Sequence, residues 1–217
     1  RIALLYRDRM GQSDNARAAY EEALKIRRTE GVAWDRVEAV WRMNKADASL
    51  KALQEFLQEF PKSANRRLAL QRIAQAQNQS GRKDEAVKTL EGSLQEFGAA
   101  AVFERWELAE RYAEKKEWPK AVEHLTALIA SDSGYGGRDR YARLANAALQ
   151  SKDPALLDQV EKTLLDALPR AQNMTDHFCA IQWPLGQGTY LDARKDHARD
   201  ITSFRAMLDA APYDDWA

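Results

Sequence analysis

The sequence predicts an all-helical protein built from repeated helix pairs, and three observations carry that prediction. Ala, Leu, Glu, Lys, Arg and Gln dominate the 217 residues, and these are residue types that lose little on entering a helix. Glycine occurs 10 times and proline 6 times, too few for the many tight turns of an all-β fold. A pattern of small and bulky residues also recurs about every 35 residues, which is typical of repeat architectures.

The recurring pattern is clearest between Gly81 and Gly98. A turn at Gly81 leads into a helix in which the small residue Ala86 precedes the bulky Leu90 by one helical turn, and Gly98 then ends the helix. Four other segments fit the same frame. The residues equivalent to Ala86 lie 33, 37, 35 and 36 residues apart, at Ala16, Ser49, Ala86, Ala121 and Leu157.

Each of these helices is expected to follow another helix, whose most closely packed residue lies twelve positions earlier. Those residues are Leu4, Val37, Ala74, Ala109 and Ala145. Three of the five are alanine, which allows two helices to approach closely. In the copy that leads to Ala121, Trp106, Ala109 and Tyr112 fall on one helix face.

These residues resemble the tetratricopeptide repeat, a helix-turn-helix unit of ~34 residues with a Trp-Leu-Gly-Tyr first helix and an Ala-Phe-Ala-Pro second helix. The resemblance covers residues 1 to about 169. It implies a right-handed α-solenoid of about five repeats, approximately 1–28, 30–61, 67–98, 102–133 and 138–169. The run from Phe56 to Ser63 also resembles the repeat variant of bacterial envelope proteins. A helical-repeat family with longer periods is the structural alternative.

The pattern changes after Pro169, and residues 170–217 are expected to form a degenerate repeat or capping helices. A short helix is predicted to begin at Thr175 and to end at Pro184, and a last helix to run from about Tyr190 to Ala211. Trp216 leaves a second interpretation open, in which this segment docks against a missing part of the protein. Because the chain begins at Arg1 inside a helical pattern, we expect a fragment of a longer protein.

Charge and composition exclude several function classes. The 33 basic and 33 acidic residues cancel, so no general positive field favours a nucleic acid. No apolar run reaches the ~18 residues that span a bilayer, which argues against membrane insertion. The single cysteine, Cys179, permits no internal disulfide. Both a cytoplasmic and a periplasmic location stay open.

No pattern of residues predicts catalysis, a metal site or a cofactor. His124 is expected at the surface, and His177 and His197 match no known metal-ligand spacing with Cys179. The glycines between Ser133 and Gly137 follow a helix and lack the Lys-Ser or Lys-Thr pair of a phosphate loop, so a connection between repeats is expected there. The sequence therefore favours a protein that is not an enzyme.

The resemblance implies that the first helix of each pair lines a concave groove that binds another protein or peptide. Carried over onto this sequence, the groove-facing residues are Trp34, Glu38, Trp41, Arg42, Gln71, Gln75, Asn78, Gln79, Glu110, Glu114 and Asn146, with Leu68, Phe103, Trp106, Asp139 and Gln150 beside them. Gln71, Gln75 and Asn78 form an amide stripe that could hold a peptide main chain. Trp106 is expected in the core, whereas Trp34 and Trp41 could be core or groove residues.

Two functions compete on this basis. The first is a scaffold that binds a partner segment in the groove. It departs from the peptide-carboxylate clamps of the family that the sequence resembles, which use Lys, Arg and Asn in the groove, since Arg42 alone matches that chemistry. The second is a structural segment or subunit of a larger assembly, which contacts its neighbours through its ends and convex face. An enzyme is the remote third alternative.

Overall fold

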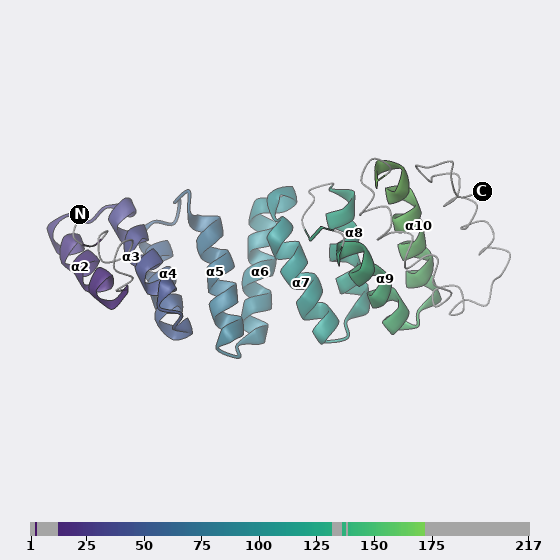
Figure 1. Ribbon diagram of the computed structural model, residues 1–217, viewed down its shortest axis with the longest axis horizontal. Helices are drawn as coiled ribbons and strands as arrows, with labels where there is room; N and C mark the ends of the chain where they lie inside the picture. The colour runs from purple at the N-terminus through teal and green to yellow at the C-terminus, as the bar shows by residue number, and fades with distance from the viewer. Residues whose placement is uncertain (1–2, 4–12, 132–135, 138, 172–217) are drawn as a thin grey trace, which may run out of the picture. The chain divides into compact units, whose positions relative to one another are not determined.

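The computed structural model describes residues 3, 13–131, 136–137 and 139–171 of the chain. The chain divides into two compact units, Arg1–Gly98 and Ala99–Ala217, and each is treated by itself. Nine α-helices and one short 3-10 turn make up the regular structure of the described residues (Figure 1). The prediction of an all-helical fold is confirmed. The helices predicted between Thr175 and Ala211 lie outside the described residues.

The first unit contains five α-helices that pack in chain order. They are α2 (Ser13–Ile26), α3 (Glu30–Arg42), α4 (Ala46–Glu59), α5 (Arg66–Gln79) and α6 (Lys83–Phe97), and the 3-10 turn η2 (Gly98–Ala100) follows them. Each helix contacts the next one along the chain, as expected for stacked helix pairs (Figure 1). The pairs are α3 with α4 and α5 with α6, and α2 precedes them in the chain.

The second unit contains two helix pairs. They are α7 (Val102–Glu114) with α8 (Trp118–Ala130), and α9 (Asp139–Ser151) with α10 (Pro154–Ala171). α8 packs against α7, α9 and α10, so it is covered on several sides. α10 continues two residues past Pro169, where the pattern predicts its end. A proline in the last turn removes only one helical hydrogen bond, so the helix can run on briefly.

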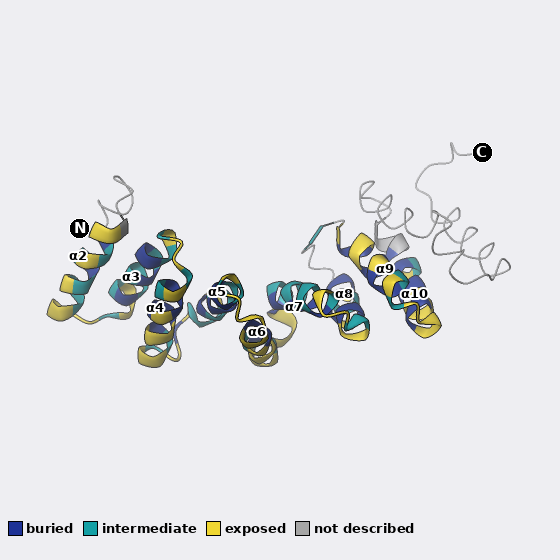
Figure 2. Cartoon of the chain, turned by 90° about the horizontal axis from the view of Figure 1, so that it is seen from below, coloured by how far each residue is buried: buried dark blue, intermediate teal, exposed yellow. Residues whose placement is uncertain are grey.

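The residues that define the repeat pattern form the contacts between helices. All five frame residues, Ala16, Ser49, Ala86, Ala121 and Leu157, are buried. Their partners on the preceding helices, Val37, Ala74, Ala109 and Ala145, are buried as well, while Leu4 lies outside the described residues. Figure 2 shows buried residues where helices of one unit meet and exposed residues on their outer sides. Small side chains at these points let the helix axes approach.

Bulky side chains fill the space between the helices of the first unit. Leu53 and Phe56 of α4 are fully buried and pack with Val37, Val40 and Ile73 from α3 and α5. Burying a side chain of this size stabilises the fold by about 1.5–3 kcal/mol. Within residues 13–131 and 139–171, no helix combines the length and the apolar character needed to cross a bilayer.

The turn inside each described pair uses one residue with a left-handed backbone. The residues are Asn44, Gly81, Lys116 and Lys152, with φ of 52°, 77°, 60° and 56°. Each stands five positions before a frame residue, so the turn belongs to the repeat. The first helix ends through backbone bonds across this residue, such as Arg82 N to Gln77 O at 2.8 Å. These turns set how the first helix of a pair lies against the second.

Candidate functional site

The residues predicted to face a partner lie on the first helices of the four described pairs. α3 carries Trp34, Glu38, Trp41 and Arg42; α5 carries Gln71, Gln75, Asn78 and Gln79; α7 carries Glu110 and Glu114; α9 carries Asn146. The sets on α3 and α5 belong to the first unit, and the sets on α7 and α9 to the second.

One guanidinium joins three of the predicted residues of α3. Arg72, on α5, donates from Nη1 and Nη2 to the two carboxylate oxygens of Glu38, at 2.7 and 3.4 Å. Its central carbon lies 5.4 Å from the ring centroid of Trp34 and 5.1 Å from that of Trp41. The Arg72 side chain is 15% exposed and that of Glu38 is 22% exposed. The salt bridge is therefore largely shielded from water.

The sequence left open whether Trp34 and Trp41 of α3 are core residues or surface residues, and the structure gives them a part in both. Trp34 and Trp41 are half-buried and pack against the apolar cluster between α3, α4 and α5. Trp34 also lies 5.0 Å from Phe56, centroid to centroid. The same two rings border the Arg72–Glu38 pair, so they contribute to the core and to the first-helix surface together.

The amides of α5 form a face beside this cluster. Gln71 and Gln75 are half-buried, and Leu68, one turn earlier, is 39% exposed. Asn78 is half-buried, whereas Gln79 is exposed. Spacings of three and four residues place Leu68, Gln71 and Gln75 in one row on the helix. The face thus offers an apolar group followed by two amides.

Another amide of the same helix has a structural role. Gln77 is buried, and its Oε1 accepts a hydrogen bond from Thr89 Oγ1 of α6 at 2.8 Å. This contact ties α5 to α6 and uses the side of α5 that faces its pair partner. Gln77 was not among the predicted site residues, and its position agrees with that.

The second unit contains a similar cluster of Trp106, Glu110 and Arg143. Arg143, on α9, contacts the carboxylate of Glu110, and its guanidinium carbon lies 4.7 Å from the Trp106 ring centroid. Trp106 is half-buried rather than fully buried. Glu114 accepts a hydrogen bond from Arg111 at 2.7 Å, and Asn146 is exposed.

The loop before α9 supplies a further contact to Trp106. Gly136 has φ of 78° and lies so close to the ring that a Cβ atom would overlap its carbons. The sequence predicts this glycine-containing stretch as a connection between repeats, and Gly136 also packs against the first helix α7. A side chain at this position would have to move the ring.

The sequence prediction missed Arg72 and Arg143, since neither occupies a groove position of the family. A signal was present: Trp and Glu recur four residues apart on α3 and α7, each followed by an arginine 34 or 33 residues after the glutamate. A Trp and a Glu at this spacing share a helix face. One repeat period later, an arginine can reach back to both.

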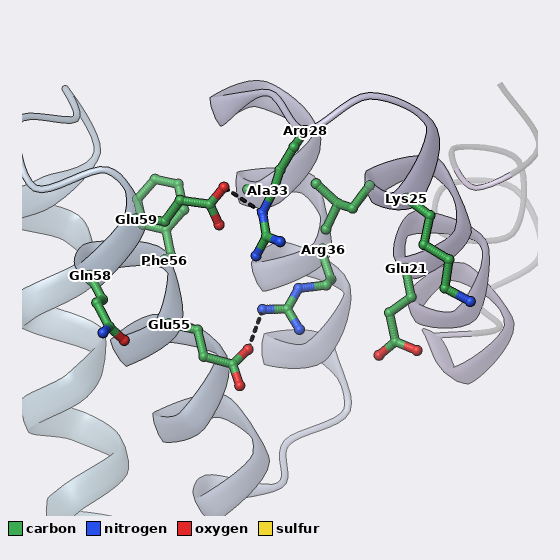
Figure 3. Close-up of a pocket in the computed structure, with 10 residues that line it drawn as sticks. Glu21, Lys25, Arg28, Ala33, Arg36, Glu55, Phe56, Gln58 and Glu59 are labelled. Atoms are coloured by element: carbon green, nitrogen blue, oxygen red, sulfur yellow. Dashed lines mark hydrogen bonds and ion pairs between the residues drawn. The ribbon is translucent and has the colours of Figure 1, made fainter.

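A separate pocket lies between α2, α3 and α4 in the first unit. Its volume is about 560 Å³, and its lining residues are Glu21, Leu24, Lys25, Arg28, Ala33, Arg36, Glu55, Phe56, Gln58 and Glu59. Figure 3 shows side chains from α2 and α4 on opposite sides, with Ala33 and Arg36 of α3 between them. None of the predicted site residues lines it.

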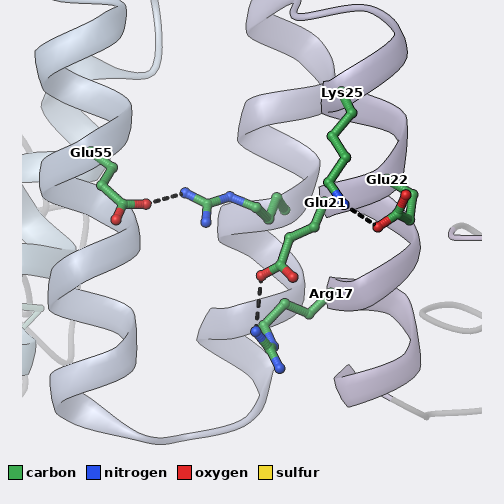
Figure 4. Close-up of polar contacts among 6 residues, drawn as sticks. Arg17, Glu21, Glu22, Lys25 and Glu55 are labelled. Atoms are coloured by element: carbon green, nitrogen blue, oxygen red, sulfur yellow. Dashed lines mark hydrogen bonds and ion pairs between the residues drawn. The ribbon is translucent and has the colours of Figure 1, made fainter.

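Ion pairs surround this pocket. Arg28 bonds Glu59 at 2.6 Å and Arg36 bonds Glu55 at 2.7 Å (Figure 3). Arg17 bonds Glu21, and Lys25 bonds Glu22, along α2 (Figure 4). The hydrogen bond that Arg28 donates to Glu59 raises the pKa of Arg28, and the one that Lys25 donates to Glu22 raises the pKa of Lys25. Both side chains therefore stay protonated near neutral pH.

The expectation that His124 lies at the surface is wrong. Its side chain is buried, and its ring stacks on Tyr112 at 5.6 Å between centroids with an 8° angle between planes. α8 packs against several helices, which covers the face that carries His124. Among the described residues, no group of His, Cys, Asp or Glu is arranged to hold a metal ion. His177, His197 and Cys179 lie outside those residues.

Comparison with family models gives the identity of the repeats. Residues 1–30 match a tetratricopeptide-repeat model, and residues 68–98 match a second tetratricopeptide-repeat model. The chain is a tetratricopeptide-repeat protein. Such repeats are generally protein–protein interaction modules and typically non-catalytic, and neither matching model describes an enzyme. The division of the rest of the chain into repeats stays a prediction.

Solved structures of other tetratricopeptide-repeat proteins show weak similarity. The C-terminal part of a repeat-containing protein from Cytophaga hutchinsonii is 12% identical, with 98% of this chain and 95% of that chain covered and a TM-score of 0.35. The TPR2AB domain of yeast Sti1, solved in a pHSP90 complex, is 16% identical, with 95% and 86% covered and a TM-score of 0.35. Comparison with curated proteins gave no significant match. Similarity this low does not bear on the function of the tetratricopeptide-repeat protein described here.

Proposed function

We propose that this tetratricopeptide-repeat protein is a scaffold that binds an extended or helical segment of another protein along α3 and α5. The observation that supports the proposal best is the face of α5 formed by Leu68, Gln71 and Gln75. Leu68 and Ile26 are the large apolar residues most exposed to water in the described part of the chain. An exposed leucine in one row with two amides is a surface with groups for both apolar and polar contacts.

The chemistry of this face suits a peptide main chain. Each glutamine amide can donate two hydrogen bonds and accept two, so it can pair with peptide N–H and C=O groups without requiring a charge. Leu68 and the tryptophans offer apolar area, which supplies the non-directional part of the binding free energy. Arg72 and Glu38 bond each other, so this pair is satisfied within the chain.

A pull-down from lysate of the source organism tests this function, with the wild type and the Gln71→Ala/Gln75→Ala variant as baits. The matched control is Gln54→Ala/Gln95→Ala, because these glutamines are exposed on the second helices α4 and α6. The proposal predicts a partner that is lost with the first variant and kept with the control. A partner retained by all three proteins would contradict binding along α5.

A second candidate is a structural segment that contacts neighbouring subunits on the side of α2 and α4. The pocket between α2, α3 and α4 favours it, together with Ile26 at the end of α2, which is 88% exposed. The variant Ile26→Ser tests this alternative. Loss of the partner with Ile26→Ser, and its retention with Gln71→Ala/Gln75→Ala, would place the contact on that side.

A further inference from the structure

The Trp, Glu and Arg cluster occurs twice in the chain. Trp34 and Trp106 are 72 residues apart, Glu38 and Glu110 are 72 apart, and Arg72 and Arg143 are 71 apart. In both copies the arginine comes from the first helix of the following pair. It bonds the glutamate of the preceding first helix and lies over a tryptophan four residues before that glutamate.

Each Trp and Glu pair forms a binding site for a guanidinium group. The electron-rich face of tryptophan attracts a cation, and arginine also stacks on it through its planar group. The glutamate supplies a carboxylate that accepts hydrogen bonds from the guanidinium nitrogens. In the first unit the site has a second ring, Trp41, and a two-bond contact to Glu38, so it surrounds the guanidinium more completely.

The two occupants differ in exposure. The Arg72 side chain is 15% exposed, whereas the Arg143 side chain is 43% exposed and contacts Glu110 through one nitrogen. An exposed ion pair of this kind contributes little to stability, because water and salt compete with it. Arg143 can therefore leave Trp106 and Glu110 at a small free-energy cost.

We propose that Trp106 and Glu110 are a recognition site for an arginine side chain of a partner protein, occupied in the free protein by the chain's own Arg143. The Trp34, Trp41 and Glu38 site has the same design with a more firmly held occupant, Arg72. The partner's guanidinium replaces the internal one on the same ring and carboxylate. This inference rests on the proposed function as a scaffold and deepens it, since it names the chemistry by which a partner is recognised on α7 of the second unit.

The test is a titration of the full chain with a hexa-arginine peptide at fixed ionic strength, followed at the tryptophan indole N–H signals by NMR. The Trp106 signal is assigned with Trp106→Phe. Removing the internal occupant with Arg143→Ala should tighten hexa-arginine binding on the order of fivefold, since the peptide no longer competes with it. The Trp106 signal should shift most.

Two controls separate this effect from general charge. Arg82→Ala removes an exposed arginine whose ion-pair partner is Asp47, and it should leave the affinity unchanged. A hexa-lysine peptide should gain less than hexa-arginine from Arg143→Ala. Equal gains for both peptides, equal gains for both variants, or an unmoved Trp106 signal would each overturn the proposal.

If Arg143→Ala loses helical circular dichroism and so fails to fold, the titration is done with Arg143→Gln. The same gain in hexa-arginine affinity is expected for that variant. The experiment also stays separate from the scaffold test, because Gln71 and Gln75 lie in the other unit. Loss of the arginine effect with a retained Gln71/Gln75 effect would overturn only this inference, and the reverse result would overturn only binding along α5.

Discussion

Gly136 lies directly against the ring of Trp106, so the residue type at this backbone position affects the candidate site around Trp106. Gly136 has a positive φ and no room for a Cβ atom, whereas its neighbour Gly137 has a φ of 50° and open space around it. A side chain at Gly137 would meet only the conformational cost of the left-handed backbone. A side chain at Gly136 would meet that cost and a steric clash with Trp106 as well. Such a pair is a matched control within one loop.

We predict that Gly136→Ala destabilises the protein by about 2–4 kcal/mol, whereas Gly137→Ala costs about 1–2 kcal/mol. Both variants force alanine into a left-handed backbone, but only the first pushes on the Trp106 ring. Thermal unfolding followed by circular dichroism measures both changes. Equal destabilisation by the two variants would show that the ring moves away at no cost.

The ion pair between Arg66 and Glu96 gives a pH prediction. Two hydrogen bonds from Arg66, at 2.7 and 3.0 Å, lower the pKa of Glu96. A lowered folded-state pKa stabilises the fold at pH above the unfolded carboxyl value, and the stabilisation is lost as the pH falls through the folded value. Because both side chains are about a third exposed, the contribution is below about 1 kcal/mol.

We therefore expect Arg66→Gln to raise the pKa of Glu96 toward its ordinary value, measured by an NMR titration of the Glu96 side chain. Lys88→Gln is the control, since Lys88 is an exposed cation on the same helix. An unchanged Glu96 pKa in Arg66→Gln would contradict the assigned cause, as would an equal rise in the control.

At the scale of helices, the turn between paired helices contains a residue with a left-handed backbone. This repeated feature was the hardest one to predict from the sequence. Gly81 fits this backbone, but Lys116 and Lys152 occupy the same position in other pairs with φ of 60° and 56°. Residues with a Cβ atom pay a steric cost in this conformation. The two lysines therefore store strain at turns that glycine would form more easily.

Replacing Lys116 with Gly should stabilise the protein by about 1 kcal/mol, because the steric cost exceeds the entropy cost of glycine in a helix-ending position. The measurement is the midpoint and free energy of chemical unfolding. Lys120→Gly is the control, since Lys120 lies inside α8 and glycine there should destabilise by about 1 kcal/mol. Destabilisation by Lys116→Gly would mean that the lysine side chain makes contacts that outweigh its strain.

The helices could be predicted from the sequence because their signals are local. The spacing of Ala86 and Leu90, or of Ala121 and Leu125, reports one buried helix face without knowledge of the neighbours. The burial of His124 was not predictable in this way, because it depends on Tyr112 of α7 and on α8 being covered by several helices. Polar neighbours in the sequence do not show how many helices cover a face.

At the scale of each unit, the candidate site depends on contacts between pairs. Resemblance to the family placed Trp34, Trp41 and Glu38 on one first helix, but their shared partner Arg72 comes from the next pair. A pairing across 34 residues becomes visible only when the helices are stacked. The amide face of α5 could be predicted without any contact between pairs, because Gln71 and Gln75 lie on the same side of one helix.

Binding of a partner segment along α5 is tested by the affinity of that segment for variants of the full chain. Each lost amide contact removes a hydrogen bond of about 0.5–1.5 kcal/mol, so Gln71→Ala/Gln75→Ala should weaken binding by about 1–3 kcal/mol. Gln54→Ala/Gln95→Ala should bind like the wild type. Isothermal titration calorimetry with the segment recovered from the pull-down measures all three proteins. A Gln71→Ala/Gln75→Ala affinity equal to that of the wild type, with helix content preserved, would show that the segment does not bind through the amides of α5.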